Sequence, residues 1–164
     1  MVERAFTLQA DPGRQAPVAK RNAADAGPIV ELAVEAATAD SADERAWGLT
    51  RLAAALREAG ELDLALTTVR VAGELNPSGW PARALCTCAV AVHCDRGDPE
   101  VAVALGEEQM KRSFDERLLH VMVRAYSEAL EATGREDYRE KWERISALLD
   151  AGRLPVSNGR RPVR

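Results

Sequence analysis

The sequence has few aromatic residues, few cysteines and no long apolar segment. Aromatic side chains make up 4% of the 164 residues, and there are three cysteines. The longest uncharged apolar stretch, residues 84–92, is far shorter than the roughly 20 residues that a membrane-spanning helix needs. An odd number of closely spaced cysteines does not fit a disulfide framework, and the first residues lack the apolar core of a signal peptide. We therefore expect a reduced, cytoplasmic protein with no membrane partner.

Common catalytic motifs are also missing. The chain contains no phosphate-binding GxxxxGK[ST] loop, no GxGxxG, no HExxH, no EF-hand loop and no GxSxG. An enzyme without them would need polar groups that converge from several helices. We expect a protein that is not an enzyme and that uses no cofactor.

One segment resembles a metal motif, CTCAVAVHC at residues 86–94. On a helix, Cys86 and His93 would lie two turns apart, about 10 Å along the axis, whereas zinc holds its ligands at about 2.0–2.3 Å. Cys86 and Cys88 would point to nearly opposite sides. We therefore predict no metal site, and interpret Cys86, Cys88 and Cys94 as small core residues.

The charge is distributed unevenly along the chain. The net charge is −4, but residues 1–22 carry +2 and residues 151–164 carry +4, which leaves −10 on residues 23–150. An acidic body disfavours nucleic-acid binding, except for a weak, salt-sensitive contact through the basic tail. The 19 arginines against three lysines, with abundant alanine, suggest a bacterial, GC-rich genome.

A repeat of about 37 residues is the most informative pattern. Gly60, Gly97 and Gly134 are evenly spaced, and each is followed three residues later by an acid. Glycine ends helices because it adopts the left-handed conformation at low cost, and an acid suits the first turn of the next helix. Aromatic residues precede the glycines, at Trp47, Trp80 and Phe114. The pattern predicts helix–turn–helix units.

The predicted fold is all-α, with seven helices in one domain at residues 28–151. A helix at 28–39, beginning at Pro28, precedes three helix–turn–helix pairs at 41–77, 78–113 and 114–151. Ser41 and Glu44 have the spacing of a capping box. Residues 1–27 are predicted to be a flexible arm and residues 152–164 a flexible basic tail. The alternative is an ordinary helical bundle in which the periodicity is fortuitous.

The first unit, WGLTRLAAALREAGELDLALTTVRVAGELNP, resembles a tetratricopeptide repeat (TPR). The matching positions are Leu52 and Ala53 for the Leu-Gly pair, Leu56 for the tyrosine, Gly60 for the turn, Ala65 and Ala72 for the small residues, and Pro77 for the closing proline. The resemblance is best over residues 41–113, because Arg139 stands where the third unit should have alanine. It implies a short right-handed solenoid, with Arg139 on a helix that packs loosely or faces solvent.

In stacked helical pairs, the first helix of each pair lines the concave surface. Positions three, seven and ten beyond the aromatics recur on that face, which gives as candidate groove residues Thr50, Arg57, Arg83, Thr87, Val90, Arg117, Val121 and Arg124, with Ala54 beside them. Four of them are arginines, whose planar guanidinium groups suit carboxylates. The opposing interpretation is that Glu58 and Glu128 pair with Arg57 and Arg124 and cancel the positive field.

Two further interpretations concern single residue types. His120 falls in the register of Ala53 and Cys86, so we expect a hydrogen-bonded packing residue at a tight helix contact rather than a catalytic base. The repeat-start aromatics fit packing between units better than a ladder that stacks on ligand.

Together these observations predict a non-catalytic adaptor that binds an acidic segment of a partner protein or peptide in the groove. The Lys and Asn clamp of TPR proteins that bind chaperone tails is missing, since Thr50 and Ala54 stand there. The alternative is an accessory or regulatory subunit of an enzyme or transcription complex, which would use its outer face or terminal arms. A homodimer is a further candidate, because it would cover an exposed end of the stack.

Overall fold

A computed structural model describes residues 26–113 and 115–151, and this part of the chain folds into seven α-helices without a strand. The helices are α1 (Ala26–Thr38), α2 (Ala42–Glu58), α3 (Leu62–Glu74), α4 (Gly79–Arg96), α5 (Pro99–Arg112), α6 (Glu116–Thr133) and α7 (Glu136–Asp150). For these residues, the prediction of an all-α fold with seven helices is confirmed. The rest of the predicted N-terminal arm, Phe114 and the predicted tail lie outside the described residues.

The first helix begins earlier than the sequence analysis predicts. It starts at Ala26, so Ala26 and Gly27 belong to α1 and Pro28 lies inside its first turn. A proline is tolerated anywhere in that turn, because the first N–H groups of a helix have no partner within it. The first residue of α1 is therefore Ala26 rather than Pro28.

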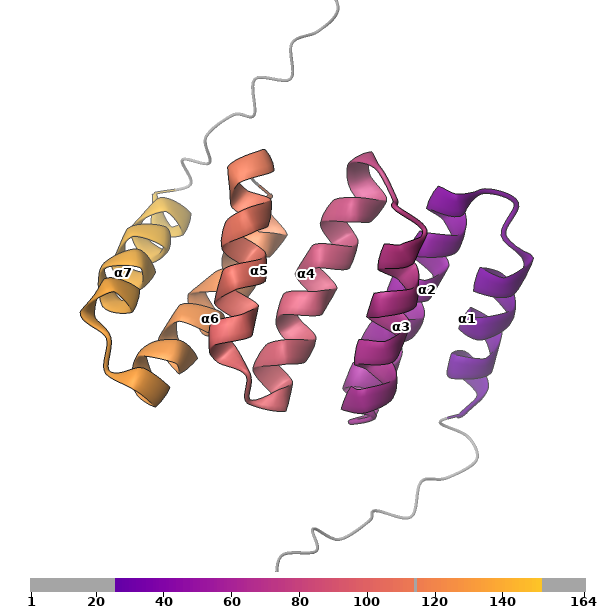
Figure 1. The fold of residues 1–164 in the computed structure, drawn as a ribbon, viewed down its shortest axis with the longest axis horizontal. Helices are drawn as coiled ribbons and strands as arrows, with labels where there is room; N and C mark the ends of the chain where they lie inside the picture. The colour runs from indigo at the N-terminus through magenta and orange to yellow at the C-terminus, as the bar shows by residue number, and fades with distance from the viewer. Residues whose placement is uncertain (1–25, 114, 152–164) are drawn as a thin grey trace, which may run out of the picture.

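The helices stand side by side in a row from α1 to α7 (Figure 1). Each of α2, α4 and α6 packs on the helix that follows it, and α2 packs on α4 as α4 packs on α6. Helices α3 and α5 also pack on the next pair, against α4 and α6 respectively. Among the described helices, the backbone of α1 packs on α2 alone and that of α7 on α6 alone. The row consequently has two ends, although side chains of α7 also reach α5 through the Lys141–Glu107 contact.

The predicted helix boundaries are confirmed at the repeated glycines. Gly97 and Gly134 are the C-caps of α4 and α6 with φ of 83° and 67°, and Gly60 follows the C-cap of α2 with φ of 76°. The left-handed conformation at these three positions favours glycine. The acids three residues further on, Asp63, Glu100 and Asp137, all lie in the first turns of α3, α5 and α7.

The capping box at the start of α2 is also confirmed. The Glu44 backbone N–H donates to Ser41 Oγ at 3.1 Å, and the Ser41 N–H donates to Glu44 Oε2 at 3.2 Å. A second contact joins this turn to the next pair, since Asp43 accepts hydrogen bonds from the Ser78 N–H and hydroxyl, both at 2.9 Å. Asp43 thus links the first turn of α2 to the N-cap of α4.

The core is divided between two clusters. One joins α4, α5, α6 and α7 around Val90, Leu119 and Met122, and the other joins α2, α3 and α4 around Ala53 and Val92. Many of the buried residues are alanines, which allow helices to approach closely. One close backbone approach is at Gly48 of α2, where a Cβ would lie 2.9 Å from the Cα of Ala36. This glycine lets α1 dock against α2.

The last pair departs from the repeat pattern, as its sequence implies. Arg139 is exposed and pairs with Glu136 at 3.2 Å, whereas Tyr138, one residue earlier, is buried against Tyr126. Arg139 thus lies on the solvent side of α7, whereas the helix as a whole packs on α6 through buried Tyr138 and Ile145.

None of the helices formed by residues 26–113 and 115–151 is both long and apolar enough to span a membrane.

Candidate functional site

A groove of about 220 Å³ runs between α2, α4 and α6. Side chains one helical turn apart form its two walls, and the start of α6 closes one side. The α2 wall contains Trp47, Thr50, Arg51, Ala54 and Arg57; the α4 wall contains Trp80, Ala84, Thr87, Cys88 and Ala91; Asp115, Arg117 and Val121 complete the lining. The groove is therefore mainly apolar, with a few arginines and one carboxylate.

Five of the eight candidate residues lie in this groove, namely Thr50, Arg57, Thr87, Arg117 and Val121. Val90 does not: it is 0% exposed and belongs to the core cluster of α4 to α7. The prediction for Val90 is wrong because the α4 wall passes through residues 84, 87, 88 and 91. Successive residues of a helix are about 100° apart, so a shift of one residue turns Val90 into the core.

The same shift moves Arg83 away from the groove lining. Its Nε lies 3.8 Å from Asp115 Oδ2, which places it beside the residue that closes the groove. Arg124 also lies outside the lining, one turn beyond Val121 on α6. The expected double row of arginines is therefore not present as such.

Two tryptophans form the most distinctive part of the groove. The rings of Trp47 and Trp80 meet edge to face, with centroids 4.2 Å apart and planes at 63°. The expectation of packing between units is confirmed for this pair, and the same two rings also line the groove. Trp80 remains 40% exposed. Sequence reasoning did not include either tryptophan among the site residues, although their position at the repeat starts was the available signal.

Carboxylates neutralise most of the candidate arginines. Asp95 lies between Arg57 and Arg124: its Oδ2 is 3.2 Å from Arg57 Nε, and its Oδ1 accepts from the Arg124 guanidinium. Arg124 also donates to Glu128 at 2.6 Å. The hydrogen bond to Asp95 raises the pKa of Arg124. The suggested pairing with Glu128 is confirmed, whereas the partner of Arg57 is Asp95 rather than Glu58.

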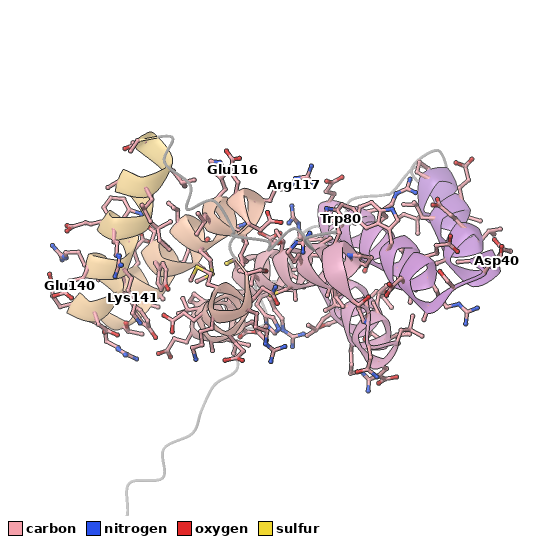
Figure 2. The ribbon with its side chains drawn as sticks, turned by 90° about the horizontal axis from the view of Figure 1, so that it is seen from above. Asp40, Trp80, Glu116, Arg117, Glu140 and Lys141 are labelled. Carbon is pink, nitrogen blue, oxygen red and sulfur yellow. The ribbon has the colours of Figure 1, made fainter. Side chains whose placement is uncertain are left out.

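Arg117 differs from the other two arginines of the lining. Arg51 pairs with Glu35 and Arg57 with Asp95, whereas no carboxylate of the described residues lies within 4 Å of the Arg117 guanidinium. Its backbone N–H donates to Asp115 Oδ1 at 2.9 Å, which fixes the start of α6. Figure 2 shows Arg117 and Trp80 along the same edge of the row. The groove lining thus contains the guanidinium of Arg117, which makes no ion pair with a described residue, together with the exposed indole of Trp80.

The neutral polar groups of the groove are engaged within the protein. Thr50 Oγ1 donates to the Ala46 carbonyl at 2.7 Å, and Thr87 Oγ1 donates to the Arg83 carbonyl at 3.0 Å. Cys88 Sγ lies 3.8 Å from the Thr50 carbonyl. Burial raises the pKa of the Cys88 thiol to about 11, so this side chain is a neutral thiol near pH 7. Because both hydroxyl groups already donate to carbonyls of their own helices, they are not free to donate to a ligand.

The other cysteines and His120 lie apart from the groove lining. Cys88 and Cys94 are buried and Cys86 is partly buried, all three as free thiols, as expected of core residues. His120 is different: its side chain is 63% exposed and its Nε2 lies 4.0 Å from Glu116. The prediction of a packing role for His120 is wrong, because Leu118, Leu119 and Met122 provide the buried face of α6.

In comparisons with known proteins, no protein-family model, no curated protein and no solved structure matches this chain.

Proposed function

We propose that this protein is a non-catalytic adaptor, built from three TPR-like helix–turn–helix repeats and an N-terminal helix, which binds a segment of a partner protein in the groove between α2, α4 and α6. The proposal rests on two side chains that line the same groove. Trp80 is 40% exposed, and Arg117 makes no ion pair with a described residue. The first repeat's resemblance to the TPR family supports the same role.

The composition of the lining indicates what the segment should contain. The lining includes three alanines, one valine and two tryptophans, which favours an apolar side chain lying against the Trp47–Trp80 pair. Tryptophan and arginine are the residue types most often found at the energetic centres of interfaces. Since Arg57 shares Asp95 with Arg124, the segment needs one carboxylate placed at Arg117 rather than a run of acids.

The proposal is tested with peptides selected on the protein itself. A random peptide library displayed on phage is selected against the immobilised wild type, and the enriched peptides are synthesised and titrated by calorimetry. We expect a shared pattern of one acidic and one bulky apolar residue. Arg117→Glu and Trp80→Ala should each weaken binding by about tenfold or more, which corresponds to about 1.4 kcal/mol.

Arg139→Glu is the matched control, because Arg139 is an exposed arginine on α7 that already pairs with Glu136. It should leave peptide affinity unchanged. Selection of no peptide, or of peptides that bind the Arg117→Glu and Trp80→Ala proteins as tightly as the wild type, would remove the groove from the proposal. Binding that survives both substitutions would instead support an accessory subunit that uses its outer face or termini.

A further inference from the structure

A second cleft lies at the other end of the row, between α5 and α7. It encloses about 380 Å³ and is lined by Glu107, Met110 and Lys111 of α5, Tyr126 of α6, and Lys141, Arg144, Ile145 and Leu148 of α7. Within the described residues the backbones of α5 and α7 stay apart, and only side chains join the two helices. Figure 1 shows α6 passing behind them, and Figure 2 shows Lys141 near the α7 end. The cleft is separate from the groove of the proposed function, since the two share no lining residue.

The two walls of this cleft are helical stripes of the kind that forms a binding surface. On α7 the lining residues are spaced at i, i+3, i+4 and i+7, and on α5 at i, i+3 and i+4, so each set points to one side of its helix. Met110, Ile145 and Leu148 supply the apolar part. The volume falls within the range of clefts that hold small molecules.

The only carboxylate in the lining is already committed. Glu107 Oε1 accepts a hydrogen bond from the Tyr126 hydroxyl at 2.9 Å and another from Lys141 Nζ at 2.7 Å. Burial, together with the bond to Glu107, raises the pKa of Tyr126, so the hydroxyl keeps its proton. Glu107 and Lys141 therefore form a neutral, fixed pair in the cleft, rather than a negative charge that would repel an anion.

The remaining charge of the cleft is positive. Lys111 pairs with Glu108 at 3.2 Å on the exposed side of α5, whereas Arg144 has no carboxylate within 4 Å among the described residues and makes no hydrogen bond there. One uncommitted guanidinium thus stands beside the aliphatic side chains of Ile145 and Leu148. Residues 1–22 carry +2 and residues 151–164 carry +4. Neither end of the chain therefore supplies the negative charge that would complement Arg144.

From this arrangement we infer that the cleft between α5 and α7 binds a small amphipathic monoanion, an aliphatic carboxylate whose head group pairs with Arg144 and whose chain lies against Met110, Ile145 and Leu148. A single free guanidinium matches a single negative charge, and it can hold a carboxylate through two parallel hydrogen bonds. The flexible side chain of Met110 suits an aliphatic chain of variable shape.

The test uses octanoate as the probe, with two partial probes for comparison. Acetate carries the head group without the chain, and octan-1-ol carries a chain of the same length without the charge. Each is titrated into the full-length, isotope-labelled protein and followed by NMR. Octanoate should give saturable shifts at residues 107–111 and 141–148, and it should bind at least about tenfold more tightly than either partial probe.

Two substitutions localise the effect. Arg144→Glu should weaken octanoate binding by about tenfold or more and leave octan-1-ol binding unchanged, while Arg139→Glu on the same helix should change neither. Both replaced arginines are exposed, and circular dichroism checks that both variants keep the helical content of the wild type. Leu148→Ala removes most of that apolar contact without adding a charge near Arg144 and should weaken octanoate binding.

Several outcomes would overturn the inference. These are shifts that do not saturate, shifts confined to α2 and α4, octan-1-ol binding as tightly as octanoate, or equal affinity in wild type and Arg144→Glu. None of them bears on the peptide groove, whose test uses Arg117 and Trp80. The two proposals therefore fail or stand separately.

Discussion

Trp80 of α4 lies edge to face against Trp47 of α2, with ring centroids 4.2 Å apart. The contact joins two helices that begin successive units, and it also forms part of the groove lining. The same pair of side chains therefore contributes to the stability of the stack and to the surface offered to a ligand. Substitutions at this pair have to be measured for both effects.

We predict that the two tryptophans stabilise the fold cooperatively. In a double-mutant cycle with Trp47→Ala and Trp80→Ala, the coupling free energy of unfolding should be about 1 kcal/mol, the range of aromatic pairs. Urea unfolding followed by far-ultraviolet circular dichroism measures it, because fluorescence would change with the tryptophans themselves. Strictly additive losses would show that the rings touch without stabilising each other.

Asp43 should be a second link between α2 and α4. Asp43→Ala removes both acceptors for Ser78 and should lower the free energy of unfolding by about 1–2 kcal/mol. Asp43→Asn keeps one oxygen acceptor and should cost less. Asp40→Ala is the control, since the Asp40 side chain is exposed and makes no hydrogen bond within the described residues. Equal losses at Asp40 and Asp43 would contradict the link.

The docking of α1 should depend on the absence of a side chain at Gly48. In Gly48→Ala the new Cβ would lie 2.9 Å from the Ala36 Cα, so α1 must move, and we expect a net loss of about 1–2 kcal/mol in unfolding free energy. Gly73→Ala is the matched control in α3, because nothing lies within 4 Å of its Cβ position. That change should stabilise the protein by up to about 1 kcal/mol through helix propensity. Chemical denaturation of both variants gives the comparison.

Alkaline pH should weaken the fold through the buried thiols. Burial raises the pKa of Cys88 from 9.0 to about 11. As the pH rises through this interval, the thiol ionises in the unfolded chain but stays protonated in the folded protein, so ionisation favours unfolding. The free energy of unfolding should therefore fall between about pH 9 and about pH 11. Cys88→Ala should show a smaller fall than the wild type, measured by urea unfolding at both pH values.

Local sequence signals predict where the helices begin and end, but they do not predict which residues of each helix face the groove. The glycines at 60, 97 and 134 and the capping box at Ser41 act within a few residues, so their effects could be predicted. The α2 wall includes Arg57, ten residues after Trp47, whereas the α4 wall passes through Ala91, eleven residues after Trp80. The same count from the aromatic therefore reaches different faces of the two helices, and on α4 it reaches Val90 in the core.

The electrostatics of the groove could not be predicted, because its pairs join residues far apart in the chain. Arg57 and Arg124 share the Asp95 carboxylate across 38 and 29 residues respectively. A partner on the same helix follows from spacing alone, as for Glu128, which is four residues from Arg124. Tertiary packing decided the other pairings, and with them which arginine stays uncommitted.

The arrangement of neighbours along the row has a consequence for how the protein opens. The backbone of α4 packs on α2, α3, α5 and α6, whereas those of α1 and α7 each pack on one helix, with α7 also joined to α5 by side-chain hydrogen bonds. In such a one-dimensional array, the terminal units detach at a free energy below that of global unfolding. Amide hydrogen exchange should be slowest in α4 and fastest in α1 and α7. Since the α5–α7 cleft has one wall on α7, fraying at that end would dismantle the cleft while the tryptophan pair stayed intact.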